Sequence, residues 1–162
     1  MISQSMRGRP MFLVCAAALL AGCGGRGEFV EVSGPASSVN LKIKQKAVVA
    51  ELALDFSARQ LGLMHREKLA PDAGMLFVHP RASKLSFHMK NTLVPLSIAF
   101  LDNQGKILQI ERMKPKDLSP TRSKNEVRFA LEVNEGWFET NGIGVGDRFD
   151  GFEKIVAGLI SS

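Results

Sequence analysis

Apolar and polar residues alternate in several short segments after residue 38, which is typical of strands with one buried face. In the first segment Val39, Leu41 and Ile43 alternate with Asn40 and Lys42, and this period of two predicts a half-buried strand. Further strands are predicted at residues 48–54, 75–78, 85–89, 96–101, 106–112 and 127–133. Many short strands with regular turns predict a mainly β sandwich or barrel rather than βαβ units.

Two short helical segments interrupt this pattern. Ser57 has a glutamine three residues later, which is the spacing of a capping box with Ser57 as the N-cap. We therefore expect a helix at residues 58–66, with Leu61 and Met64 facing inward. A single helical turn is expected within the glycine-rich residues 135–146.

Turn residues set the predicted ends of the strands. Residues 102–105 read Asp-Asn-Gln-Gly, a four-residue hairpin loop in which Gly105 suits a positive φ. Pro80 is expected to end the strand at residues 75–78, because proline lacks the N–H that a ladder needs. Residues 113–126 are polar and contain two prolines, which predicts a long loop.

The N-terminus has the pattern of an export signal. Arg7 and Arg9 precede an uncharged apolar run at residues 11–21. This run is too short for a transmembrane helix, which needs roughly 20 apolar residues, and it fits a secretory signal peptide. The run ends in Leu20-Ala21-Gly22-Cys23, which resembles a bacterial lipobox. The competing interpretations are an ordinary secreted protein and an N-terminal core segment.

The lipobox resemblance implies cleavage before Cys23 and acylation of this cysteine, which would anchor the chain in a membrane. We therefore divide the chain into a signal peptide (residues 1–22), a flexible tether (23–38) and a folded domain (39–162). Gly24 follows the cysteine where an aspartate would favour retention in the inner membrane. The expected location is the cell envelope, on the outer membrane facing the periplasm.

Cleavage also changes the charge and the cysteine count. The net charge of +5 includes Arg7 and Arg9, so the mature chain carries a milder positive excess. Together with the expected location, this argues against a nucleic-acid partner. Cys15 leaves with the signal peptide and Cys23 is acylated, so the mature chain has no pair of cysteines for a disulfide.

A series of motifs in the folded domain resembles the family called domain of unknown function 192, over residues 41–148. The motifs are Gly62-Leu63-Met64, Gly74-Met75-Leu76-Phe77-Val78, residues 87–96 with the core Met-Lys-Asn-Thr, and Leu131-Glu132-Val133 followed by Gly136. The resemblance implies a single jelly-roll-like antiparallel β-sandwich with one or two short helices. It implies no activity, catalytic residue or cofactor. His88 stands where the family usually has tryptophan, and Ser97 where it usually has aspartate.

One polar cluster in these motifs is a candidate binding patch. Lys90, Asn91 and Thr92 follow a predicted strand, and Arg66 and His88 are further polar candidates. Together they predict a small patch for an anion or a sugar. The alternative is structural, because Asn and Thr often close turns through hydrogen bonds to the backbone.

The sequence favours a non-enzymatic envelope protein that binds a glycan, a lipid or a protein. The first alternative is an envelope hydrolase or transferase with a site near Lys90 and Asn91. Asp102 and Glu132 are further candidate acids, although a lone carboxylate is weak evidence for catalysis. The second alternative is a copper- or zinc-binding protein. Its candidate ligands are His65, His79, His88, Met64, Met75 and Met89.

Overall fold

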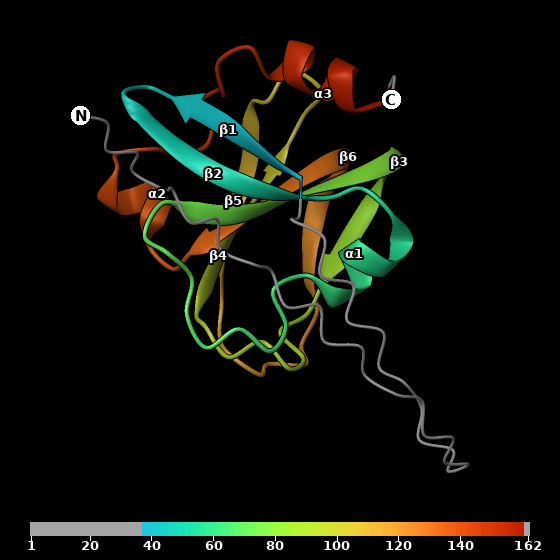
Figure 1. Ribbon diagram of the computed structural model, residues 1–162, viewed down its shortest axis with the longest axis vertical. Coiled ribbons are helices and arrows are strands. Elements are labelled where there is room, and N and C mark those ends of the chain that lie inside the picture. The colour runs from blue at the N-terminus through green and yellow to red at the C-terminus, as the bar shows by residue number, and fades with distance from the viewer. Residues whose placement is uncertain (1–36, 161–162) are drawn as a thin grey trace, which may run out of the picture. The chain divides into compact units, whose positions relative to one another are not determined.

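A computed structural model describes residues 37–160 of the chain (Figure 1). Strands make up most of the regular structure, and the helices are short. The elements are β1 (Ser38–Ile43), β2 (Lys46–Ala53), α1 (Phe56–Leu61), β3 (Ala73–Phe87), β4 (Leu96–Leu101), β5 (Ile107–Met113), β6 (Thr121–Asn134), α2 (Trp137–Thr140) and α3 (Phe152–Ile160). The prediction of a mainly β domain is confirmed.

The six strands form one sheet in the order β1-β2-β3-β6-β4-β5. Four neighbouring pairs are antiparallel, whereas β2 and β3 are parallel. The parallel pair arises because the chain leaves β2 through α1 and crosses back before β3 starts at Ala73. The sheet is therefore mixed rather than wholly antiparallel, and the described residues contain three helices rather than one or two.

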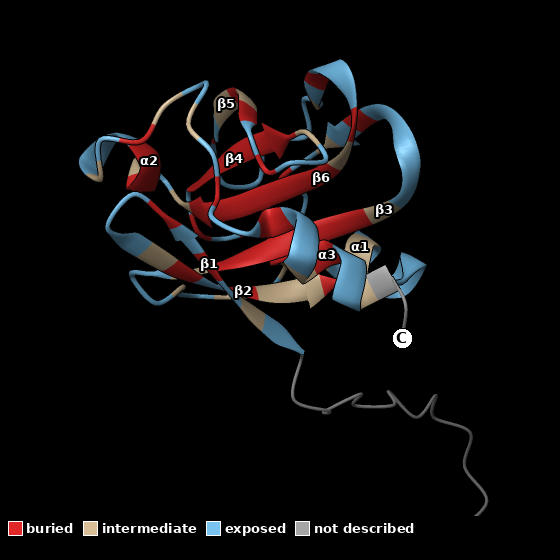
Figure 2. Cartoon of the chain, turned by 90° about the horizontal axis from the view of Figure 1, so that it is seen from above, coloured by how far each residue is buried: buried red, intermediate tan, exposed pale blue. Residues whose placement is uncertain are grey.

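Successive side chains of the central strands point to opposite faces of the sheet, and each face carries its own apolar cluster. In β3, Leu76 belongs to one cluster and Phe77 to the other. The first cluster includes Phe138 of α2 and Phe152 of α3, and the second includes Leu63, which follows α1. Figure 2 shows the buried segments concentrated on the central strands β3, β4 and β6. Burial of both faces is what allows a sheet of this size to supply a core.

Two strands are longer than the sequence predicted. β3 continues past Pro80 to Phe87, because its pairing with β6 shifts register between Val78 and Ser83. A bulge of this kind tolerates proline, because the bulged residues leave the hydrogen-bonded ladder. The expectation that Pro80 ends the strand was wrong. β6 likewise begins at Thr121, so the connection from β5 is shorter than predicted.

Helix α1 is shorter than predicted and begins two residues earlier. Its N-cap is Asp55, whose carboxylate accepts a hydrogen bond from Ala58 N at 2.8 Å. The helix ends at Leu61 with Gly62 as its C-cap, so it does not reach residue 66, and Leu61 is 57% exposed. The predicted Ser57 cap and the inward-facing Leu61 were therefore wrong. Ser57 instead donates a hydrogen bond to the Asp55 carboxylate at 2.6 Å.

The hairpin between β4 and β5 turns through the predicted residues 102–105, although five residues, 102–106, separate the two strands. Asp102 Oδ1 accepts hydrogen bonds from Gln104 N and Lys106 N, and Gly105 has a φ of +76°. Helix α3, which we did not predict, packs against this loop. Its Phe152 makes an edge-to-face contact with Phe129, with ring centroids 5.1 Å apart.

The predicted lipid anchor at Cys23, the signal peptide and most of the tether lie outside the described residues, and they stay predictions. Within residues 37–160 we find no helix with the length and apolar character needed to cross a membrane.

Candidate functional site

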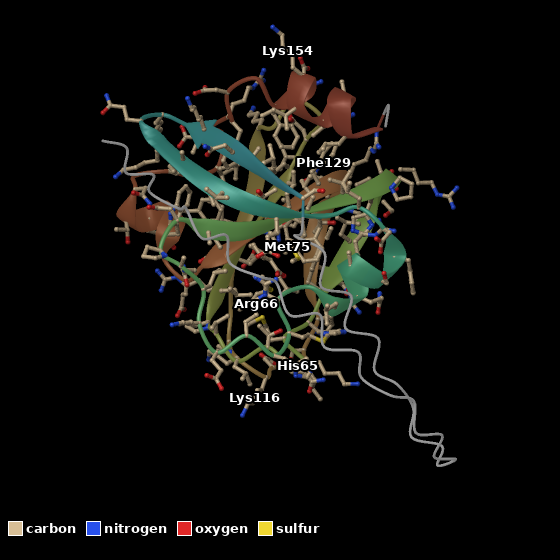
Figure 3. All side chains as sticks on the ribbon, in the orientation of Figure 1. His65, Arg66, Met75, Lys116, Phe129 and Lys154 are labelled. Carbon is tan, nitrogen blue, oxygen red and sulfur yellow. The ribbon has the colours of Figure 1, made fainter. Side chains whose placement is uncertain are left out.

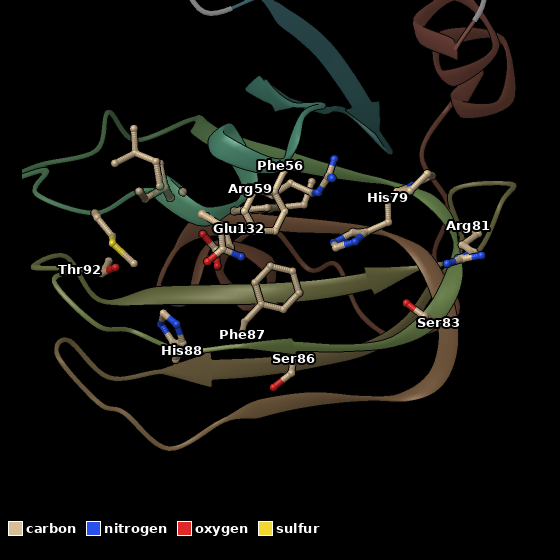
Figure 4. A pocket seen from close by; sticks show the side chains of 17 residues that line it. Phe56, Arg59, His79, Arg81, Ser83, Ser86, Phe87, His88, Thr92 and Glu132 are labelled. Atoms are coloured by element: carbon tan, nitrogen blue, oxygen red, sulfur yellow. The ribbon is translucent and has the colours of Figure 1, made fainter. Parts of the chain in front are cut away.

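A pocket of about 360 Å³ lies between α1 and the sheet, on the side of the second apolar cluster (Figure 4). Four segments that are far apart in the sequence form its wall: α1 with the residues that follow it, the bulged half of β3, the turn at Thr92, and Glu132 of β6. Because the wall depends on the pairing of β3 with β6, the pocket is a property of the folded sheet rather than of one motif.

Glu132 is the most unusual residue in this wall. It is 5% exposed and lies on the opposite face of β6 from Leu131 and Val133. Within residues 37–160, its carboxyl makes no hydrogen bond or ion pair. Burial raises the pKa of Glu132 to about 8, because a low-dielectric environment disfavours the charged form. The carboxyl is therefore largely protonated at neutral pH.

His79 of β3 is a second neutral group in the same wall. Burial lowers the pKa of His79, and the positive charge of Arg59 lowers it further. Its Nε2 is buried without a hydrogen-bond partner among the described residues. A buried polar atom of this kind is uncommon in folded proteins and calls for an explanation such as a ligand or a water molecule.

Arg59 joins α1 to the edge of the pocket. Its Nη1 donates hydrogen bonds to the backbone carbonyls of Leu54 and Val78, the latter at 3.0 Å. Since Val78 directly precedes His79, these bonds hold the guanidinium beside the histidine. Arg81 also lines the pocket and is exposed at its rim.

Apolar side chains form the rest of the pocket. Phe77 and Phe87 meet edge to face, with ring centroids 5.0 Å apart. Phe56 and Leu61 of α1 also line the pocket and are 72% and 57% exposed. A pocket with aromatic walls and a few polar groups is typical of a small-molecule site.

Three connected loops close the end of the domain near Thr92. His65, Asn91 and Lys116 have φ values of +63°, +57° and +61°. His65 N donates to Asn91 O at 2.8 Å, and Lys116 N donates to Thr92 O at 3.1 Å. Figure 3 shows His65 and Lys116 at the end of the domain opposite α3. These bonds hold Thr92, which is 4% exposed, in the pocket wall.

The structure separates the residues of the predicted binding patch. His88 and Thr92 line the pocket, whereas Lys90 and Asn91 lie on an exposed turn outside its wall. Arg66 forms a two-pronged ion pair with Glu51, with N–O distances of 2.5 and 2.7 Å. The guanidinium beside Glu51 lowers the pKa of that carboxyl. The role of the patch in binding stays a prediction.

The predicted metal ligands and the predicted catalytic acids lie partly in the pocket wall and partly outside it. No cluster of three or more His, Cys, Asp or Glu suited to a metal ion occurs in the described part of the chain. Met75 and Met89 are buried in the second apolar cluster. Asp102 caps the β4–β5 loop and is not among the residues that line the pocket. Glu132 is the predicted acid that does reach the pocket, and His79, predicted as a metal ligand, also lines it.

These features define a class of protein: a mainly β domain with a mixed sheet and a pocket that contains a buried, unpaired carboxyl. The chain belongs to the family called domain of unknown function 192 (DUF192), described as "Uncharacterized ACR", whose sequence profile matches residues 39–151. The resemblance identified from the motifs is therefore confirmed.

Two solved structures share this fold. The first is a "putative transcription regulator" from Sinorhizobium meliloti 1021, with 34% identity, a TM-score of 0.66 and coverage of 72% of this chain and 97% of that one. The second is a protein of unknown function from Novosphingobium aromaticivorans DSM 12444, with 28% identity, a TM-score of 0.63 and coverage of 70% of this chain and 83% of that one. No curated protein matches the chain.

Proposed function

We propose that this chain is a lipid-anchored protein of the cell envelope whose β domain binds a small ligand in the pocket between α1 and the sheet. The observation that carries this proposal is Glu132, a buried carboxyl without a partner in the wall of a pocket of about 360 Å³. Its burial costs stability, and a bound ligand that pairs with the carboxyl would offset that cost.

The size of the pocket favours a small molecule over a protein surface. Its volume lies within the range of roughly 300–1,000 Å³ that ligand pockets occupy. The predicted partners were an envelope glycan, a lipid or a protein. Of these, one sugar unit or the head group of a lipid has the right size for the pocket.

The pocket chemistry favours binding over hydrolysis. Hydrolytic sites commonly pair an acid with a second carboxylate or an activated nucleophile. Among the described residues that line the pocket, Glu132 is the only carboxyl. No described side chain is hydrogen-bonded to Glu132 as a base or nucleophile would be.

The N-terminal pattern supports the location. Arg7, Arg9, the apolar run and Leu20-Ala21-Gly22-Cys23 agree with export followed by acylation of Cys23. A tether of about 15 residues has a root-mean-square reach near 20 Å, which lets the domain lie against the bilayer or swing clear of it.

Saturation-transfer NMR of the purified full chain tests the binding function. A set of a few hundred small molecules is screened against the wild type, Glu132→Gln and Glu126→Gln. Glutamine keeps the size of Glu132 but cannot ionise, and Glu126 is an exposed residue of the same strand and serves as the matched control.

The proposal predicts ligands that compete with one another, bind the wild type and the Glu126→Gln variant, and lose at least tenfold in affinity with Glu132→Gln. A screen without ligands, or ligands that bind all three proteins equally, would overturn it.

A further inference from the structure

We infer that the ligand is a zwitterion, with an ammonium group bound at Glu132 and an anionic group bound near Arg59 and Arg81. This inference rests on the proposed binding function and specifies the chemistry of the same pocket. It follows from an uneven distribution of charge-bearing groups along the pocket wall.

Glu132 and Arg81 lie at different ends of the pocket. Figure 4 shows Glu132 on the side of Thr92, and His79 and Arg81 on the other side of the Phe87 ring. The pKa of Glu132 agrees with this separation, because burial is the only cause of its shift and no arginine lowers it. By contrast, Arg59 does lower the pKa of His79.

The Glu132 end has the chemistry of an ammonium site. A buried carboxylate without a partner is stabilised most by a bound cation, because burial deprives the carboxylate of much of its hydration. Phe77 and Phe87 line the same pocket, and the faces of aromatic rings attract ammonium groups. The neighbouring strands present only Met75 and Ile98 opposite Glu132, so no protein cation from these positions occupies the site.

The other end has the chemistry of an anion site. The hydrogen bonds from Arg59 Nη1 to two carbonyls fix the guanidinium in place, and its other nitrogens make no hydrogen bond to a described residue. Arg81 is exposed at the rim and forms no ion pair with a described residue. Two arginines with free donors suit a carboxylate or a phosphate.

Binding of the ammonium group requires that Glu132 release its proton to the solvent. Its pKa of about 8 means that ionisation at pH 7 costs a factor of about ten in affinity. Affinity for the zwitterion should therefore rise by about tenfold from pH 6 to 7 and by about fivefold from pH 7 to 8. The other titratable groups that face the pocket are His79 and His88. Arg59 and Arg81 keep their charge over this range.

Titration calorimetry of the full chain with matched probes tests this inference. 6-Aminohexanoate carries both charges, whereas hexylamine and hexanoate carry one each on the same chain. L-phenylalanine and glycerophosphoethanolamine distinguish an amino acid from a lipid head group as the source of the zwitterion. Each titration is done in two buffers of different ionisation enthalpy, which reports the protons released.

We expect at least one zwitterion to bind ten times or more tightly than both single-charge probes, with release of close to one proton at pH 7. Glu132→Gln should abolish the proton release and the pH dependence. Arg81→Gln should weaken zwitterions and hexanoate but not hexylamine. Glu126→Gln and Arg122→Gln, which alter exposed residues of β6, should change neither the affinities nor the proton release. If Glu132→Gln does not fold, the rise in wild-type affinity with pH remains the test.

If hexanoate or an uncharged molecule binds more tightly than the zwitterions, and its binding depends on Glu132, the zwitterion inference is overturned and the binding function stands. Binding of the zwitterions without proton release would also overturn it. Failure of every probe, combined with an empty NMR screen, would overturn both proposals.

Discussion

Glu132 on β6 lies directly opposite Met75 on β3 in the register of the two central strands. On its other side it faces Ile98 of β4. Both neighbours belong to the second apolar cluster, so Glu132 occupies a position where the cluster would otherwise continue. A residue that weakens the core at such a position is typical of a functional site, where activity is obtained at a cost in stability.

The stability of the protein should depend on pH through Glu132. The unfolded glutamate titrates near 4.5 and the folded one near 8. Between these values only the folded state keeps the proton, so the free energy of unfolding falls as pH rises, by at most about 1.4 kcal/mol per pH unit. Glu132→Gln should remove this slope. Urea unfolding at pH 5, 6, 7 and 8 measures it.

His79 acts in the opposite direction, because its lowered pKa reduces stability as pH falls below about 6.5. This contribution is common to the wild type and to Glu132→Gln and cancels in their difference. The stability of Glu132→Gln relative to the wild type should therefore grow from pH 5 to pH 8. A difference that is constant over this range would contradict the assigned pKa.

The ion pair between Arg66 and Glu51 should stabilise the loop after α1. Its side chains are only 33% and 28% exposed and pair through two hydrogen bonds. A double-mutant cycle with Arg66→Gln and Glu51→Gln should give a coupling of about 1 kcal/mol at pH 7. Because the pair lowers the pKa of Glu51, the coupling should disappear as pH falls below about 4.5. A coupling that does not decline at all between pH 7 and pH 2 would contradict this account.

Contact between the β4–β5 loop and α3 should make Gly105 sensitive to substitution. An added Cβ would lie 2.5 Å from Phe152 Cβ, on a backbone with a φ of +76°. Gly142 has a φ of +63° with open space around it and is the matched control. Gly142→Ala should cost about 1 kcal/mol from the backbone alone. Gly105→Ala should cost about 1–3 kcal/mol more because of the clash. Equal losses in urea unfolding would show that α3 does not pack on this loop.

The lipid anchor predicts different results for the two cysteines. Cys23→Ser should move the protein out of the membrane fraction and prevent acylation, because the modified sulfur is absent. Cys15→Ser, within the predicted signal peptide, should leave the membrane location and the acylation unchanged. Intact-mass spectrometry of the membrane-bound protein should show loss of residues 1–22 and gain of acyl chains. An unmodified Cys23 in the wild type would contradict the anchor.

Local patterns predicted those elements that depend on local chemistry. Strands such as β1 follow from strict alternation, and the loop at Gly105 follows from its turn residues. Helix α1 was misplaced because Asp55 and Ser57 are both good N-caps two positions apart, and the pattern does not rank them. Helix α3 was missed, although Phe152, Ile155 and Val156 have the i, i+3, i+4 spacing of a helix face.

The pocket could not be predicted in the same way. Glu132 was recognised as a candidate acid, but its burial depends on strands that are brought together from distant parts of the chain. The path of β3 past Pro80 depends on a bulge against β6, and this bulged half supplies His79 and Phe87 to the pocket. Long-range pairing of this kind leaves no local signal in the sequence.

Carbon-13 NMR titration of the Glu132 carboxyl tests the central claim most directly. The signal is assigned by its loss in Glu132→Gln, and its midpoint is measured in the protein without ligand. An unpaired carboxyl buried in the pocket wall should titrate with a pKa of about 8. A midpoint near 4.5, like that of an exposed glutamate, would show a solvated or paired carboxyl and would contradict the account.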